Sequence, residues 1–310
     1  MPRLGPAGAV AVAVALALTL ALGPSSHTAT AAAPPDAAVV YGGLGSWVDI
    51  FAKQAWRHPD AVVASLQAHR IRTLYLQTSN YSQPVDIVDR AAVGRFLDDA
   101  HAAGLKVVAW YLPSFADPAV DSRRALAAIR FRSARGAAFD SFALDIEATV
   151  VSNVKLRDAR LMTLARTLRA AAPPAYPLGA IVPSPVGMRR HPHYWPHFPF
   201  ARLAETFDAF VPMAYFTYYA KTPAAAYAYA RDVVLAVRAD TGRPDVPVHL
   251  IGGIANRMGV QELGGFMRAV RDCGVLGVSL YAFLETSGVE WSQLDAATLG
   301  DAPAAACSRR

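Results

Sequence analysis

Short apolar runs alternate with longer segments of helical periodicity along most of the chain. The runs are rich in β-branched and aromatic residues, which favour strands, and the segments between them repeat apolar positions as amphipathic helices do. Several of these segments end at glycine, a common helix terminator. The expected strands span residues 38–45, 71–78, 105–113, 139–147, 176–183, 207–216, 246–254 and 276–283.

Eight strand and helix units predict a single α/β domain, a (β/α)8 TIM barrel, over residues 34–300. An open doubly wound sheet is the alternative. The glycines of residues 41–46 (YGGLGS) do not fit the phosphate-binding fingerprint that often follows the first strand of that fold. In a barrel, the side chains that act on substrates lie at the carboxyl-terminal ends of the strands. The ends of the predicted strands are therefore where functional residues are expected.

Residues 1–33 differ from the rest of the chain. Arg3 precedes a long apolar stretch, and the small residues at 29–33 offer a cleavage site, which together are typical of a secretory signal peptide. An uncleaved membrane anchor is the alternative, because the apolar stretch approaches the roughly 18 residues that a spanning helix needs. We expect a secreted, extracellular protein with no stable membrane insertion after cleavage, ending in a short tail over residues 301–310.

Composition narrows the possible partners. The chain has 310 residues, 54% of them hydrophobic, which is enough to bury a sizeable core. Its formal charge of +6 comes from scattered arginines, which favours a solvated surface over nucleic-acid binding. In an oxidising compartment Cys273 and Cys307 either form a disulfide or stay unpaired, and both readings remain open. The sequence carries no nucleotide-binding or zinc-protease motif, and we expect no cofactor, no metal and a monomer.

The fourth predicted strand, residues 139–147 (FDSFALDIE), ends in two acids. Alternate residues of a barrel strand point inward, so Ala143, Asp145 and Glu147 share the inner face. Two neighbouring carboxylates raise one pKa and can place a proton donor beside an ionised partner. The pair is therefore either catalytic, with Glu147 as the acid, or a structural rim of ion pairs.

This strand resembles the D-G-x-D-x-D-x-E signature of the family eighteen chitinases, which are (β/α)8 barrels. The sixth strand, with Met213-Ala214-Tyr215-Phe216, is similar to their M-x-Y-D motif. The resemblance implies that Glu147 protonates the glycosidic oxygen, that Asp145 assists it and that Tyr215 hydrogen-bonds the substrate. Three positions depart from the family: its glycine is Ser141, its middle inward aspartate is Ala143, and its sixth-strand aspartate is Phe216.

Without those carboxylates, a glycosidase needs another acid as nucleophile or base. Glu285, just past the eighth strand, is the leading candidate for this role, and a helix cap or rim residue is its alternative. Asp49 after the first strand and Asp117 after the third are weaker candidates. The seventh strand ends in residues 252–254 (GGI), without a carboxylate.

Aromatic and short polar side chains cluster at the strand ends, where aromatic rings can stack on sugars. The expected substrate-binding residues are Trp47, Asp49, Gln77, Trp110, Tyr111, Met213, Tyr215 and Tyr281. Residues 188–200 (MRRHPHYWPHFPF) are too rich in proline and histidine for a helix. We expect them to form either a wall of the substrate cleft, with Tyr194 and Trp195, or a plain surface loop.

Three functional hypotheses follow, the third of which is a barrel with chemistry other than glycosidic cleavage, since the fold by itself implies no reaction. The first is a secreted glycoside hydrolase that cleaves a polysaccharide or cell-wall glycan. The second is a carbohydrate-binding barrel that has lost turnover, which the missing carboxylates at Ala143 and Phe216 favour.

Overall fold

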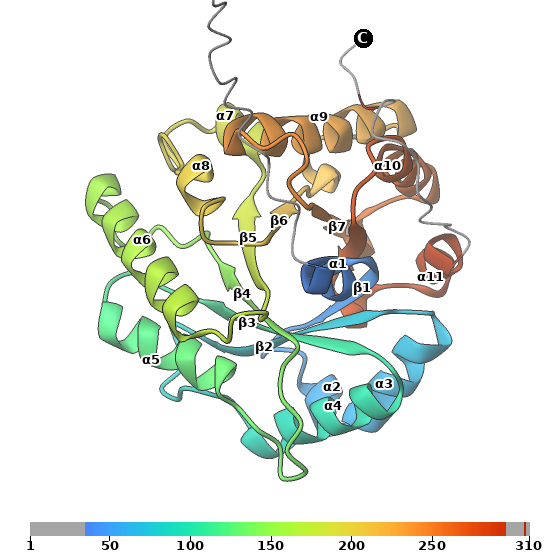
Figure 1. Cartoon of the computed structure of the whole chain (residues 1–310). Coiled ribbons are helices and arrows are strands. Elements are labelled where there is room, and N and C mark those ends of the chain that lie inside the picture. Colours follow the sequence, from blue (N-terminus) through green and yellow to red (C-terminus); the bar gives the residue numbers. More distant parts are fainter. Residues whose placement is uncertain (1–34, 296–306, 308–310) are drawn as a thin grey trace, which may run out of the picture. The chain divides into compact units, whose positions relative to one another are not determined.

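The computed structural model describes residues 35–295 and 307. Among them, eight parallel strands form a closed barrel in chain order, and β8 pairs back onto β1 (Figure 1). This is the (β/α)8 barrel that the alternation of strands and helices predicts. The strands are β1 (Gly43–Val48), β2 (Thr73–Asn80), β3 (Lys106–Leu112), β4 (Ser141–Asp145), β5 (Leu178–Pro183), β6 (Ala209–Met213), β7 (His249–Ile254) and β8 (Gly277–Tyr281).

Helices follow the strands and surround the barrel. The α-helices of the described residues are α1 (Pro35–Tyr41), α2 (Lys53–Arg57), α3 (Pro59–Ala68), α4 (Arg90–Ala102), α5 (Pro118–Ile129), α6 (Val154–Ala171), α7 (Pro185–Arg190), α8 (Phe200–Leu203), α9 (Pro223–Thr241), α10 (Val260–Asp272) and α11 (Gly288–Asp295). Three short 3-10 helices, η1 (Phe216–Tyr218), η2 (Ala255–Arg257) and η3 (Phe283–Glu285), follow β6, β7 and β8 among these residues. The expectation that residues 188–200 contain no helix is therefore wrong at both ends, because residues 188–190 belong to α7 and Phe200 begins α8.

Each strand buries both of its faces, which explains its nearly continuous apolar sequence. In β3, Val107 and Ala109 belong to the large apolar cluster between sheet and helices, whereas Val108 and Trp110 belong to a smaller cluster inside the barrel. The same alternation holds in β4, where Leu144 faces the helices and Ala143 the interior. Parity along the strands therefore decides which side chains reach the inside of the barrel.

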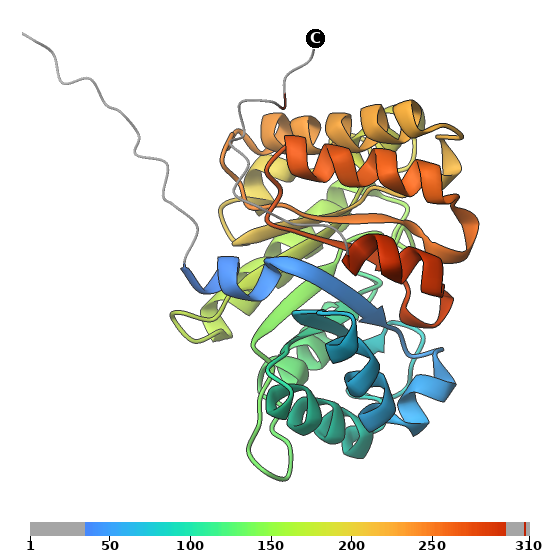
Figure 2. The same ribbon diagram turned by 90° about the vertical axis from the view of Figure 1, so that its right-hand side faces the viewer.

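The first predicted strand is wrong in part, because residues 35–41 form helix α1 and β1 begins only at Gly43. Ala37, Val40 and Tyr41 are buried at the spacing of one helix face, while Val39 stays exposed. The carbonyl of Val40 accepts a hydrogen bond from Thr73 Oγ1 at 2.6 Å, at the start of β2. Helix α1 thus lies where the strands begin (Figure 2), and burial there outweighs the strand preference of valine and tyrosine.

A series of hydrogen bonds between buried polar groups crosses the barrel interior next to α1. The imidazole of His249 is fully buried; its Nδ1 lies 2.8 Å from the carbonyl of Tyr41, and its Nε2 lies 2.9 Å from Ser279 Oγ. Ser279 Oγ also accepts a hydrogen bond from Trp47 Nε1 at 2.8 Å. Since a carbonyl only accepts, His249 donates from Nδ1 and its Nε2 accepts from the serine hydroxyl. Both ring nitrogens of the neutral imidazole therefore have a hydrogen-bond partner.

We expect His249 to make folding sensitive to mild acid. Burial lowers its pKa from 6.5 to about 4, so between these pH values the unfolded chain binds a proton that the folded chain does not, and stability falls as the pH falls. From pH 7 to pH 5 this amounts to about 2 kcal/mol of unfolding free energy. Urea unfolding at both pH values should show a correspondingly smaller loss in His249→Gln, and equal losses in the two proteins would contradict the expectation.

A disulfide joins the end of α10 to the carboxyl-terminal segment. Cys273 and Cys307 are bonded at an S–S distance of 2.06 Å, and both are buried. The predicted signal peptide, residues 1–33, lies outside the described residues. Within the described part of the chain, no helix is both long and apolar enough to cross a membrane.

Candidate active site

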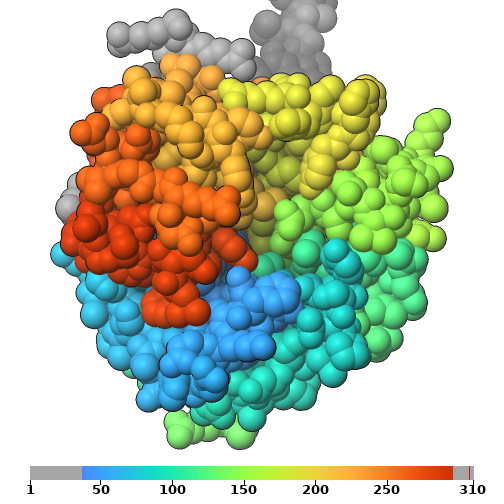
Figure 3. All heavy atoms as spheres, turned by 180° about the vertical axis from the view of Figure 1, so that it is seen from behind, coloured from blue at the N-terminus to red at the C-terminus, as the bar shows by residue number. Residues whose placement is uncertain are grey.

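A cavity of about 250 Å³ opens where β5 and β6 end and where the chain leaves β4. Figure 3 shows a recess in this face of the molecule, between the gold and the yellow-green parts of the chain. The lining is mainly aromatic and apolar and includes one carboxylate. The lining residues are Glu147, Pro183, Ser184, Gly187, Met188, His191, Tyr194, Met213, Tyr215, Tyr218, Tyr219 and Tyr229.

The two acids of the fourth strand lie at this end of the barrel. Strand β4 ends at Asp145, whose side chain is almost fully buried and whose Oδ1 has no hydrogen-bond partner. Glu147 follows two residues later and lines the cavity, and its backbone carbonyl accepts a hydrogen bond from the hydroxyl of Tyr194. An unpartnered buried carboxylate is costly, so this pair is poorly explained as a rim of ion pairs.

Burial shapes the electrostatics of the pair. It raises the pKa of Asp145 well above its ordinary value, and the charge of the nearby Glu147 raises that pKa further. Burial likewise raises the pKa of Glu147. Because the two groups interact strongly, they titrate together, and the pair holds one proton at a pH where isolated carboxyl groups have lost theirs. A retained proton beside a cavity is what a general acid requires.

Strand β6 contributes the neighbouring wall. Met213 and Tyr215 both line the cavity. Burial raises the pKa of Tyr215 well above its ordinary value, and the charges of Glu147 and Asp145 add to this, so the phenol stays protonated beside the pair. Phe216 instead turns outward and stacks on Phe266 at 5.3 Å. The position of the chitinase aspartate is thus used here for packing against α10.

An aromatic floor fills the interior of the barrel next to the acids. Trp47 stacks on Tyr75 at 4.1 Å and meets Trp110 edge-on at 5.7 Å. Both indoles are buried, and Ala143 lies beside Trp110 in the strand register. Ala143 is fully buried in the same interior cluster as the two indoles, so the position of the family's middle inward aspartate is apolar here. Trp47 and Trp110 therefore support the site from below.

Asp49 and Tyr281 lie at the carboxyl ends of β1 and β8 and are not among the residues that line the cavity. Tyr281 donates a hydrogen bond from its hydroxyl to Asp49 Oδ2 at 2.8 Å, and its ring lies 6.3 Å from that of Tyr215. Asp49 Oδ1 accepts from the backbone amides of Phe51 and Ala52 at 2.8 and 3.0 Å. The Asp49 carboxylate is therefore held in place by the loop that follows β1.

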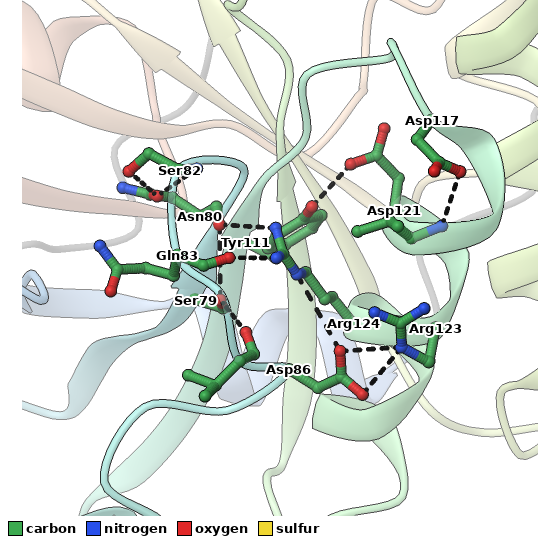
Figure 4. Close-up of polar contacts among 12 residues, drawn as sticks. Ser79, Asn80, Ser82, Gln83, Asp86, Tyr111, Asp117, Asp121, Arg123 and Arg124 are labelled. Carbon is green, nitrogen blue, oxygen red and sulfur yellow. Dashed lines mark hydrogen bonds and ion pairs between the residues drawn. The ribbon is translucent and has the colours of Figure 1, made fainter.

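Three other predicted residues lie away from the cavity. Gln77 is buried, and its Oε1 accepts a hydrogen bond from the amide of Ile50 at 3.0 Å. Tyr111 has the opposite parity to Trp110 and faces the helices, where its hydroxyl donates to Asp121 Oδ1 at 2.6 Å (Figure 4). Glu285 ends η3, where its side chain is exposed and does not contribute to the cavity.

The network of Figure 4 is structural. Arg124 is buried and donates from Nη1 to the carbonyl of Asn80 at 2.9 Å and from Nη2 to that of Gln83. It thereby fastens the loop after β2 to α5. Asp117 caps the start of the same helix by accepting from the amides of Ala119 and Val120 at 3.0 and 3.1 Å. These contacts account for Asp117 as a capping residue.

The segment after β5 divides between the cavity and the outer core. Tyr194 lines the cavity, as a cleft wall would. Trp195 is buried on the outer side, where its Nε1 donates to Asp158 at 2.8 Å and the Arg157 guanidinium lies 3.9 Å from its ring. No cluster of three or more potential metal-ligating side chains occurs among the residues that the structure describes.

Sequence reasoning missed several lining residues. Ser184 caps α7 through a hydrogen bond from the amide of Gly187 at 3.1 Å and also accepts from the hydroxyl of Tyr229 at 2.9 Å. Tyr229 belongs to α9, far along the chain from any strand end. Its position in the alanine-rich start of an amphipathic helix gave no signal of a site. Met188 lay in a segment interpreted as a loop, although it belongs to α7.

Comparisons with known proteins bear on the fold. No family model matches the sequence, and no curated protein sequence matches it. Solved structures do match. One is GH5_18 from Streptomyces cattleya in complex with GlcNAc, at 13% identity and a TM-score of 0.61, covering 83% of this chain and 79% of that one.

Two further matches are similar in fold. The glycoside hydrolase domain of PgaB (BpsB) from Bordetella bronchiseptica has 12% identity and a TM-score of 0.55, covering 84% of this chain and 99% of that one. A chitinase from Chromobacterium violaceum has 13% identity and a TM-score of 0.52, covering 83% and 99%. The resemblance to glycoside hydrolase barrels, chitinases among them, is therefore confirmed at the level of the fold.

Proposed function

We propose that this protein is a glycoside hydrolase that cleaves a polysaccharide or cell-wall glycan, with Glu147 as the proton donor. The observation that carries the proposal is the position of Glu147 in an aromatic cavity at the carboxyl ends of the strands, beside the buried carboxyl group of Asp145. Catalysis at this end of the barrel is the rule for the fold. The fold shared with glycoside hydrolases supports the same reading.

The singly protonated pair suits glycosidic cleavage. The electrostatics of the pair favour the proton on Asp145, so the proton must pass to Glu147 before Glu147 can protonate the leaving oxygen and leave the negative charge on Asp145. That charge then stabilises the positive charge that develops on the sugar ring in the transition state. Tyr215, which stays protonated beside the pair, can donate a hydrogen bond to the substrate. Asp145 and Tyr215 are thus partners of Glu147 rather than separate catalysts.

A glycoside hydrolase also needs a second catalytic carboxylate. Glu147 is the one carboxylate among the described residues that line the cavity. Asp49 reaches the mouth through its hydrogen bond with Tyr281, whereas Glu285 is exposed on η3. We propose Asp49, and not Glu285, as the additional acid, since a carboxylate that accepts hydrogen bonds from two backbone amides keeps a fixed position.

We also propose that the protein acts outside the cell, after removal of residues 1–33. The bond between Cys273 and Cys307 supports this, because disulfides persist in oxidising compartments.

A carbohydrate-binding barrel without turnover is the second candidate. The observation that favours it is the apolar packing of Ala143 and Phe216 at positions where chitinases carry carboxylates. Reducing-sugar release from a panel of chitin oligomers, mannan and peptidoglycan, measured on the purified protein and on Glu147→Gln, separates the two functions. Release by the parent that the variant lacks supports hydrolysis, whereas binding without release by the parent supports the second candidate.

The pH profile tests the role of Asp145. In the parent, activity should fall on the alkaline side as the pair loses its last proton. The negative charge of the acid that has already ionised raises the pKa for this loss. In Asp145→Asn the pair has one titrating group, so Glu147 ionises beside a neutral partner and the alkaline limb of kcat should move to lower pH. Activity from pH 4 to 9 checks this. An unmoved limb would show that the two acids do not share a proton.

A further inference from the structure

The tyrosines of the cavity are not spread evenly around Glu147. Tyr215, Tyr218 and Tyr219 follow β6 and lie in or next to η1, and Tyr229 lies beside Tyr219 on α9. The ring of Tyr218 lies 6.3 Å from that of Tyr215 and 6.4 Å from that of Tyr219, edge-on to both. The rings therefore form a row that begins beside the acid pair and passes through the exposed ring of Tyr218.

The outer end of this row is held rigidly. Tyr219 stacks on Tyr229 at 5.0 Å, and the guanidinium of Arg190 lies 4.6 Å from the ring centre of Tyr219 and 5.5 Å from that of Tyr229. The Tyr229 hydroxyl is in turn fixed by Ser184. These contacts come from α7, η1 and α9 together. A fixed aromatic ring loses little conformational entropy when a ligand binds.

Tyr218 itself is left uncovered. Its side chain is 55% exposed, although it lines the cavity and lies between two better buried rings. An exposed aromatic face beside an apolar cavity is suited to a ligand that presents C–H groups on one face and hydroxyl groups at its edge, as a pyranose ring does.

From this geometry we propose that Tyr218, supported by Tyr219, forms a second sugar-binding subsite, so that a glycan chain extends from Glu147 along η1. The inference rests on the proposed function for the identity of the ligand as a glycan. It adds that recognition needs a chain longer than the sugars next to the acid. The subsite selects oligosaccharides by length, and Tyr218 is its specificity-determining residue.

Binding isolates the subsite from catalysis. Calorimetric titration of the Glu147→Gln protein with hexasaccharides of N-acetylglucosamine, mannose and glucose, and with the matching disaccharides, measures affinity without turnover. We expect at least one hexasaccharide to bind. Adding Tyr218→Ala should weaken its binding about tenfold, the effect of losing one ring contact, and leave binding of the disaccharide unchanged. Adding Tyr218→Phe instead, which keeps the ring, should leave the affinity for the hexasaccharide within about twofold of that of the Glu147→Gln protein.

Tyr81→Ala is the matched control, because Tyr81 is also exposed but lies in the loop after β2 and outside the cavity. It should bind the hexasaccharide as the parent does. The proposal is overturned if no hexasaccharide binds, if Tyr218→Ala binds it as well as the parent, or if Tyr218→Phe loses as much affinity as alanine. A parent that binds through Tyr218 but releases no reducing sugar refutes the hydrolase and leaves the subsite standing.

Discussion

Replacing Glu147 with glutamine is expected to lower kcat by about 10²–10⁴-fold on any glycan that the protein hydrolyses, the usual contribution of a general acid. Glutamine keeps the shape of the side chain but has no acidic proton to transfer. Because KM reflects contacts that the amide preserves, the loss should fall on kcat. Initial rates over a range of substrate concentrations measure the two separately.

Unfolding of the Glu147→Gln variant is not expected to account for the lower kcat. Burial raises the pKa of Glu147, which means that the folded state disfavours its charge, so a neutral amide should not lower the unfolding free energy. Glu285→Gln makes the same chemical change at an exposed residue outside the cavity and should change kcat by less than about twofold. If the Glu147 variant kept parental kcat, Glu147 would not be the acid.

Breaking the Cys273–Cys307 disulfide is expected to lower the unfolding free energy substantially. The bond closes a loop over a sequence separation of 34 residues. Releasing the unfolded chain from such a loop restores entropy equivalent to about 3–4 kcal/mol at 25 °C. Urea unfolding of the parent with and without reductant measures the change, monitored by tryptophan fluorescence.

Cys307→Ser supplies the control, because this variant has no bond to reduce. Its unfolding free energy should match that of the reduced parent, and reductant should not change it further. If reductant left the parent as stable as before, the bond would contribute nothing measurable to the fold. Activity should survive at low temperature, since both cysteines lie outside the cavity.

The alternation of apolar runs sufficed to predict the barrel because all eight strands are buried on both faces and leave a strong signal. The exception, α1, shows the limit of that signal. Val40 and Tyr41 read as strand residues, and only the open end of the barrel, which is built from distant segments, makes a helix favourable there. Local propensity cannot report an apolar surface that other parts of the chain create, such as the end of the barrel that α1 covers.

The candidate site was predictable to a similar degree. Parity placed Asp145 and Glu147 at the mouth, because both follow directly from the register of one strand. The same rule separates Trp110 from its neighbour Tyr111, which faces the helices. The contact between Tyr229 and Ser184 could not be predicted, since it depends on how α9 packs against α7. The walls of the site depend on tertiary contacts that no single strand encodes.

Helix α1 also has a practical consequence for handling the protein. The chain enters the barrel at the end where the strands begin, whereas the candidate cavity opens at the other end. A carrier protein or a solid support joined ahead of Pro35 is therefore attached on the side away from the mouth. Molecules immobilised in this way should retain access to a polymeric substrate, and attachment through the loops after β1 or β6 should block it.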